Sequence, residues 1–209
     1  MNVVVEPFGD AGLRARLPDH ASGASLLEAL RALPHVVDAV VAERHALVTF
    51  GRVLDPRAQA AAREALRAAI ASALDAPTPQ SPARSHEVQV DYGGDDLQSV
   101  ARDTGLTREQ VIALHARGEY VVAAIGFLPG FAYLRGLNPR LTLPRRASPR
   151  ARIAALSVAI AGGYTGVYPC ASPGGWHLIG TAVGFAPFRA DEGAVWKLGD
   201  RVRFLEAGR

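Results

Sequence analysis

Cysteine is almost absent from this chain, which has a single one, Cys170. One thiol cannot form an internal disulfide, so a disulfide-stabilised secreted scaffold is excluded, and so is a cysteine-rich zinc site. We therefore expect a protein of a reducing cytoplasm. A lone cysteine between a strand and a turn is typical of a small apolar filler, which we favour over a catalytic thiol.

Lysine is equally scarce, because Lys197 is the only one in 209 residues. The sequence has no G-x-x-x-x-G-K-[ST] loop and so lacks the lysine with which the usual nucleotide-binding loop holds phosphates. Nothing around Lys197 resembles the neighbours of a biotinylated lysine, so we expect no biotin on this chain. No serine stands in a G-x-S-x-G elbow, which leaves a hydrolase triad without local support.

Long hydrophobic runs are absent too. No stretch approaches the roughly 20 apolar residues that cross a bilayer, and the beginning MNVVVEPFGD has no basic segment before an apolar one. We expect a soluble cytosolic protein without membrane association. No pair of histidines has metal-site spacing, so no metal is expected. Three carboxylates, those of Asp91, Asp95 and Asp96, are typical of turns and helix N-termini rather than of a cation site.

The charge balance is mildly basic, at +3 with a pI of about 9.4. The arginines are scattered and interleaved with Asp and Glu, which favours a solvated basic surface over a nucleic-acid partner. The exception is the segment PRRASPRAR, where four arginines gather at positions 145, 146, 150 and 152. Such a patch can hold a phosphate or carboxylate, or can face a partner protein.

Residues 1–76 are expected to form an α+β domain with the order β-β-α-β-β-α. Short strands are indicated at Val3–Val5 and Leu13–Leu17, followed by a helix that buries Leu26, Leu30 and Leu33 and ends at Pro34. A hairpin over residues 36–50 comes next. A second helix begins with Asp55 as its N-cap and buries Ala62, Leu66, Ile70 and Leu74. The order favours an open-faced sandwich with both helices on one side.

Residues 77–85 lie in a stretch that is rich in proline and lacks large apolar residues, so we expect a linker. Residues 86–209 are expected to form a second domain. It begins with a strand over His86–Tyr92 and two helices at about 96–104 and 108–117, the second with a capping box of Thr107 and Gln110. Strand and turn patterns then continue almost to the end.

The segment between Gly126 and Thr181 is dense in constrained corners, such as Pro129-Gly130, Gly162-Gly163 and Pro173-Gly174-Gly175. Glycine supplies positive φ and proline fixes φ, so corners this frequent suit a small β-barrel rather than helices. The sequence therefore predicts an α+β protein, in which an N-terminal α+β sandwich domain precedes a β-barrel.

Four separated motifs, GFLPGFAYL, LPRRASPR, SVAIAGGYTGVYP and SPGGWHLIG, carry a close resemblance to the B subunit of the bacterial 5-oxoprolinase. The same family is called allophanate hydrolase subunit 1 or the KipI-type kinase inhibitors. The resemblance runs from about Val88 to Glu206 and implies a cyclophilin-like barrel. Two positions depart from many relatives, because Tyr164 and His177 stand where glutamine is common. A changed ligand preference would follow if they touch ligand.

The resemblance implies a subunit that converts 5-oxoproline to glutamate with hydrolysis of ATP. Its partners would be a larger C subunit, of the KipA or allophanate hydrolase subunit 2 type, and an A subunit of the lactam-utilisation type. ATP with Mg²⁺ would be a co-substrate bound mainly by a partner. The shared site would give this chain no turnover alone.

No catalytic residue is carried over. For substrate or phosphate binding we expect two arginines as anion contacts, three hydroxyl side chains on loops, two glycines of a turn and a tryptophan as wall or anchor: Arg145, Arg146, Thr165, Tyr168, Ser172, Gly174, Gly175 and Trp176. Structural roles for the glycines, which permit positive φ, and for the tryptophan, as core, stay open.

Two other functions also stay open. The KipI-type relatives suggest a non-enzymatic inhibitor of a sensor histidine kinase, which would bind a helical dimerisation domain through the barrel's loops. Urea carboxylase suggests half of a carboxyltransferase. The absence of a biotinyl lysine excludes the carrier role but leaves the transferase half possible.

Overall fold

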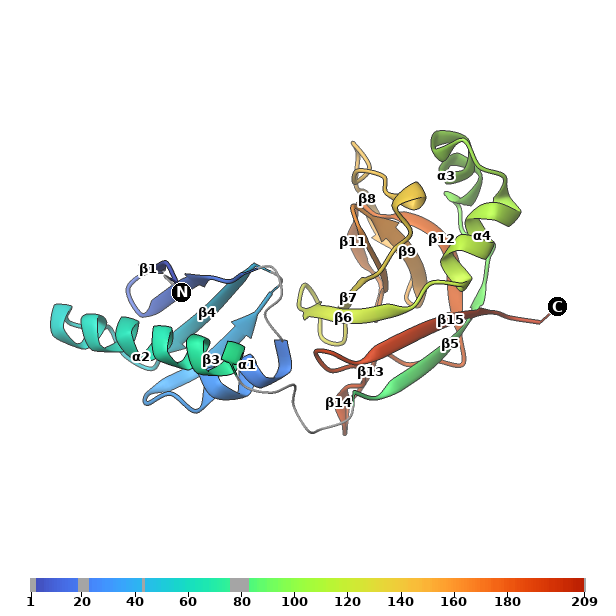
Figure 1. Cartoon of the computed structure of the whole chain (residues 1–209). Coiled ribbons are helices and arrows are strands. Elements are labelled where there is room, and N and C mark those ends of the chain that lie inside the picture. Colours follow the sequence, from blue (N-terminus) through green and yellow to red (C-terminus); the bar gives the residue numbers. More distant parts are fainter. Residues whose placement is uncertain (1–2, 19–22, 43, 76–82, 209) are drawn as a thin grey trace. The chain divides into compact units, whose positions relative to one another are not determined.

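The computed structural model describes residues 3–18, 23–42, 44–75 and 83–208, and the chain divides into two compact units, Met1–Pro82 and Ala83–Arg209. Figure 1 shows both units, the first in blue to blue-green and the second in green to red. Most of the expected linker, residues 77–82, lies outside the described residues. Of the rest, residues 83 and 84 precede the first strand of the second unit.

The first unit has the expected order of elements. A four-stranded antiparallel sheet has the order β1-β2-β4-β3, and its strands are β1 (Val5–Pro7), β2 (Gly12–Arg16), β3 (Val36–Val41) and β4 (His45–Phe50). Helices α1 (Gly23–Arg31) and α2 (Pro56–Asp75) pack against each other, α1 also on β3 and α2 on β1. The first strand starts two residues later than expected.

Local signals explain both helices of this unit. The Oδ1 atom of Asp55 accepts the backbone N–H of Ala58 (2.9 Å) just before α2, as expected of an N-cap. Helix α1 ends at Arg31, ahead of Pro34, and buries Leu26 and Leu30. Buried positions four apart on each helix give the apolar face that covers the sheet.

The second unit is a closed barrel of seven strands in the order β10-β7-β6-β15-β5-β12-β9. These strands are β5 (Ser85–Asp91), β6 (Tyr120–Ile125), β7 (Ala132–Arg135), β9 (Ser157–Ala161), β10 (Tyr164–Val167), β12 (His177–Val183) and β15 (Arg201–Glu206). The strands β5 and β15 run parallel and the other pairs antiparallel. The expected mixture of helix and strand, with a barrel, is confirmed.

Shorter elements decorate the barrel. Helices α3 (Leu97–Thr104) and α4 (Arg108–Ala116) pack on β12 and β15, respectively, and Figure 1 shows them together at one end of the barrel. The capping box of Thr107 and Gln110 forms as expected. Outside the barrel are the pairs β8 (Arg150–Ile153) with β11 (Ser172–Gly174) and β13 (Phe188–Arg189) with β14 (Gly193–Ala194), and a 3-10 turn, η1 (Pro139–Leu141).

Strand β9 separates two hydrophobic cores, because all five of its residues are buried. Val158 and Ile160 belong to the core inside the barrel, whereas Ala159 and Ala161 belong to a second core. Successive side chains of a strand point to opposite faces, so the second core lies on the outer face of the barrel wall. Two of the residues expected to form a site, Tyr168 and Trp176, belong to this outer core.

Candidate functional site

A buried carboxylate joins the arginine segment to the barrel. Asp96, only 3% exposed, accepts hydrogen bonds from Arg146 Nη1 (2.7 Å) and from Arg150 through both Nη1 and Nη2 (2.8 Å each). It also accepts the backbone N–H of Leu178 in β12 (2.8 Å). Asp96 stands at the N-cap position of α3, as expected, yet its side chain makes no capping hydrogen bond. One carboxylate thus fixes three segments of the chain.

Ionisation of Asp96 is favoured by these partners. Burial alone would raise the pKa of the carboxyl, but the hydrogen bonds from Arg150 and the Leu178 amide, with the charges of Arg150 and Arg146, outweigh it and hold the pKa below the usual 3.8. Arg146 therefore has a partner within the chain, and its neighbour Arg145 is exposed. Of the two arginines expected at a site, Arg145 is the one presented to solvent.

The arginine segment, residues 144–152, pairs in antiparallel fashion with the segment that contains Gly174 and Gly175. We call these two residues the glycine turn. Gly174 pairs with Arg150 in the β8–β11 ladder, and the backbone N–H of Arg146 donates to the Gly175 carbonyl (2.8 Å). At the far end, His177 Nε2 donates to the Pro144 carbonyl (2.9 Å). The two segments named by the sequence, LPRRASPR and SPGGWH, are therefore brought together by backbone pairing.

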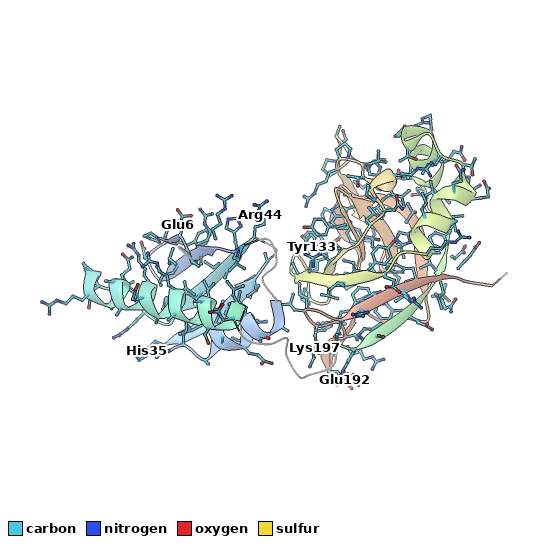
Figure 2. The ribbon with its side chains drawn as sticks, in the orientation of Figure 1. Glu6, His35, Arg44, Tyr133, Glu192 and Lys197 are labelled. Carbon is cyan, nitrogen blue, oxygen red and sulfur yellow. The ribbon has the colours of Figure 1, made fainter. Side chains whose placement is uncertain are left out.

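Beneath this pair lies a group of rings that we call the outer aromatic cluster: Phe127, Phe131, Tyr133, Tyr164, Tyr168 and Trp176. Neighbouring rings lie 5.1 to 6.3 Å apart with steep interplanar angles, as edge-to-face pairs do. Tyr133, labelled in Figure 2, contacts Phe131, Tyr164 and Trp176. The expected residues Tyr168 and Trp176 are buried members of this cluster.

The hydroxyl of Tyr168 lies at the glycine turn, because a Cβ added at Gly174 would overlap it. Burial raises its pKa, while the backbone amide of Trp176 and the charge of Arg145 act in the opposite direction. Ser172, in β11, is buried as well, and its Oγ has no hydrogen-bond partner within the described residues.

Thr165 lies elsewhere than expected, which corrects its placement on a loop. It is in strand β10, fully buried inside the barrel, and its hydroxyl donates to the Ala159 carbonyl (3.0 Å). Its oxygen therefore accepts from Nε2 of His115 (2.9 Å), and Nδ1 of His115 accepts from the Tyr92 hydroxyl (2.7 Å). Every group in this chain of hydrogen bonds is satisfied, as a structural network requires.

His115 was not expected from the sequence. Burial lowers its pKa from 6.5 to about 3, so the neutral ring is the stable form in the folded barrel. It lies against Phe204, with ring centroids 4.7 Å apart, and its carbonyl accepts the Tyr120 hydroxyl (2.8 Å). Helix α4 places this side chain in the core, four residues after the buried Val111, and its polar character concealed this spacing in the sequence.

The two glycines of the turn differ in what a side chain would meet. A Cβ at Gly174 would overlap the Tyr168 hydroxyl and lie 2.6 Å from Ile153 Cδ1, whereas a Cβ at Gly175 would meet nothing nearer than 3.6 Å, at Pro149. We expect Gly174→Ala to lower the free energy of unfolding by about 1–3 kcal/mol through overpacking. The matched Gly175→Ala should stay within about 0.5 kcal/mol. Urea denaturation of both variants checks this, and equal losses would contradict it.

Other regions of the described chain offer less chemistry. The first unit has a groove of about 220 Å³, which is lined mainly by apolar residues of α2, of the segment just before β3 and of the end of β4 with the segment after it. One of the lining residues, His35, is labelled in Figure 2. Within the described ranges, no three His, Cys, Asp or Glu side chains are grouped to hold a metal ion. No helix in the described part of the chain has the length and apolarity of a membrane span.

Comparisons with known proteins agree with the motifs. The family model described as carboxyltransferase domain, subdomain C and D, matches residues 3–195. The B subunit of 5-oxoprolinase from Bacillus subtilis (strain 168) is 48% identical over 124 residues, which are 57% of this chain and 51% of that protein. The chain thus spans about half the length of the curated relative it matches, and its resemblance to the B subunit of 5-oxoprolinase is confirmed.

Solved structures share the fold. The crystal structure of TTHA0988 matches with a TM-score of 0.77 and 39% identity over 95% of this chain and 40% of that one. Urea carboxylase of Kluyveromyces lactis matches with a TM-score of 0.70 over 99% of this chain and 22% of that one. At 17% identity this second likeness is one of fold alone.

Proposed function

Because the chain belongs to the family of carboxyltransferase domain subdomains C and D, we propose that it is the B subunit of an ATP-dependent 5-oxoprolinase. The observation that carries this proposal is the 48% identity to the Bacillus subtilis protein of that name. The chemistry of the arginine segment, which lies next to the outer aromatic cluster, also supports the proposal. There the exposed Arg145 precedes Arg146, whose backbone pairs with Gly175, and the Tyr168 hydroxyl adjoins Gly174.

The proposed reaction explains the need for such groups. An unstrained lactam is a poor electrophile, so its amide oxygen first takes the γ-phosphoryl group of ATP and ADP leaves. Water then adds to the activated carbon, the C–N bond of the ring breaks and the nitrogen takes a proton, which leaves an acyl phosphate. A second water hydrolyses this acyl phosphate, so that one 5-oxoproline, one ATP and two waters give glutamate, ADP and phosphate. Each step develops negative charge on oxygen, which preorganised donors stabilise.

We assign the residues of this chain as follows. Arg145 binds the anionic group of the substrate or the transferred phosphate through its guanidinium. The hydroxyls of Tyr168 and Ser172 supply hydrogen bonds beside it. Arg146 and Arg150 hold the loop in place through Asp96 rather than binding ligand themselves.

The remaining machinery is proposed to come from partners. A larger C subunit would make most of the contacts to ATP and Mg²⁺ and would complete the site. An A subunit would join the assembly. The fold of nearly the whole chain occurs inside longer polypeptides, as 40% of TTHA0988 and 22% of the yeast urea carboxylase. Because this fold forms part of larger chains elsewhere, we propose that it functions in a complex with further subunits here.

The test is co-expression with the candidate A and C subunits, followed by an assay of ATP-dependent glutamate release from 5-oxoproline. We expect turnover by the full assembly and a loss of at least 100-fold when this chain is omitted. We expect none from this chain alone. Full activity without this chain would overturn the proposal.

The family description favours a second candidate, the transfer of a carboxyl group from carboxybiotin held on another protein. The two candidates differ in their co-substrates. Carboxyl transfer would consume carboxybiotin at this chain's site without glutamate formation, whereas the 5-oxoprolinase assembly would show no response to biotin. Adding avidin to the assay separates them, since it would stop only the biotin-dependent reaction.

A further inference from the structure

Phe127 combines two unfavourable features in one residue. Its φ is 75°, in the left-handed region that favours glycine, and its side chain is 58% exposed. It follows Gly126 in the turn between β6 and β7, so a glycine stands next to the position that requires left-handed backbone. A bulky residue in this conformation is an outlier, and such outliers cluster at functional sites.

The other non-glycine residues with positive φ in the described chain have an evident structural role. Leu156 turns the chain between β8 and β9, its N–H donates to the Tyr168 carbonyl (2.7 Å), and its side chain packs on the inner core. The carbonyl of His35 accepts the N–H of Gly51 (3.2 Å) beside β3. Phe127 gains little burial for its strain, so packing alone does not account for it.

The surroundings of Phe127 are those of the candidate site. Its ring contacts Phe131, at 5.5 Å between centroids, and Tyr168, at 6.3 Å, both edge to face. Tyr168 is the residue on whose hydroxyl the charge of Arg145 acts. The Tyr168 hydroxyl also adjoins the strand that pairs with the arginine segment, because a Cβ at Gly174 would overlap this hydroxyl and Gly174 pairs with Arg150. The exposed ring of Phe127 therefore adjoins a buried residue whose hydroxyl lies at the candidate site.

We propose that Phe127 is a specificity-determining residue of this site, whose ring forms an apolar wall against the methylene face of the bound cyclic substrate. Arg145 binds the anionic group of the substrate, and the ring covers the apolar side that Arg145 leaves open. This inference rests on the proposed function. It goes beyond it by naming a contact that selects for shape and apolarity rather than for charge.

The test compares three variants in the assembled enzyme. Phe127→Gly removes the ring and relieves the strained φ, so we expect the KM for 5-oxoproline to rise about tenfold, as for loss of one apolar pocket contact, with kcat within about twofold. Phe127→Tyr keeps the wall and should restore KM to within about threefold. Phe188→Ala removes another exposed ring (43%) and should leave KM unchanged.

A thermal measurement separates this role from a structural one. In Phe127→Gly, relief of strain offsets the lost ring contacts, so Tm should stay within about 3 °C of the wild type. A raised KM with an unchanged Tm supports the proposal. An unchanged KM of Phe127→Gly in an active assembly overturns it. A rise in KM that is accompanied by a large fall in Tm also overturns it, and so does an equal rise in KM in Phe188→Ala.

Failure of the proposed function gives a different result from failure of this inference, because the wild-type assembly would then release no glutamate. The inference is in that case decided by binding to the assembled complex, in which this chain is labelled with fluorophenylalanine and 5-oxoproline is titrated. A shift of the fluorine signal that is missing in Phe127→Leu would support the contact with the ring. No shift of this signal at saturating 5-oxoproline would overturn it.

Discussion

Replacing Asp96 with asparagine is expected to lower the free energy of unfolding of the second unit by about 3 kcal/mol, at the lower end of the loss for a broken buried ion pair. The variant keeps the size of the side chain but removes the charge that holds Arg146 and Arg150. It leaves two guanidinium groups facing an amide. Urea denaturation followed by circular dichroism measures the loss.

The matched control is Asp95→Asn, one residue earlier and exposed. It should change the free energy of unfolding by no more than about 0.5 kcal/mol. A loss below about 1 kcal/mol in Asp96→Asn would mean that the loop does not depend on the carboxylate. In the proposed 5-oxoprolinase assembly, Asp96→Asn should also lower kcat/KM, because Arg145 is carried on the same loop.

Acid is expected to destabilise the barrel through His115, with a slope of about 1.4 kcal/mol per pH unit between pH 6.5 and 3. The folded pKa lies below the unfolded value, so the unfolded chain binds the extra proton. The stabilisation is therefore complete above pH 6.5 and is lost as the pH falls toward 3. Below about pH 4 Asp96 adds to the loss of stability. The pKa of its carboxyl is lowered in the folded chain, so the unfolded chain again binds the proton more readily.

A comparison with His115→Gln isolates this contribution. Glutamine offers both a donor and an acceptor to Tyr92 and Thr165 but does not titrate. Between about pH 6 and 4.5, the unfolding free energy of the wild type should fall by about 1.4 kcal/mol per unit more than that of the variant. Parallel pH profiles would show that His115 is not a buried neutral base.

Much of the fold could be predicted from the sequence, because local rules determine it. The caps at Asp55 and Thr107 and the alternation over residues 86–92 placed their elements correctly. The strand and turn pattern expected toward the end of the chain did not single out strands β7 and β8. Each is only four residues long and lies inside the glycine and proline run, where turn residues conceal a short alternation.

The site was less predictable, for a physical reason. The sequence pointed to the correct segments, since the arginine loop and the glycine turn do meet. It could not show that Asp96, 50 residues before Arg146, would hold that loop. Nor could it show which face of β10 Thr165 occupies, because that depends on the closure of the barrel. The feature that marks Phe127 is its positive φ, which the sequence does not show.

The most direct test of this account is the kcat/KM for 5-oxoproline of the assembled enzyme that carries Arg145→Ala. The account predicts a loss of at least about 100-fold, as for an essential charge-assisted contact to the reacting anion. The control Arg140→Ala, at another exposed arginine outside the loop, should stay within about twofold. Equal activity of the two variants would contradict the placement of the site at the arginine loop.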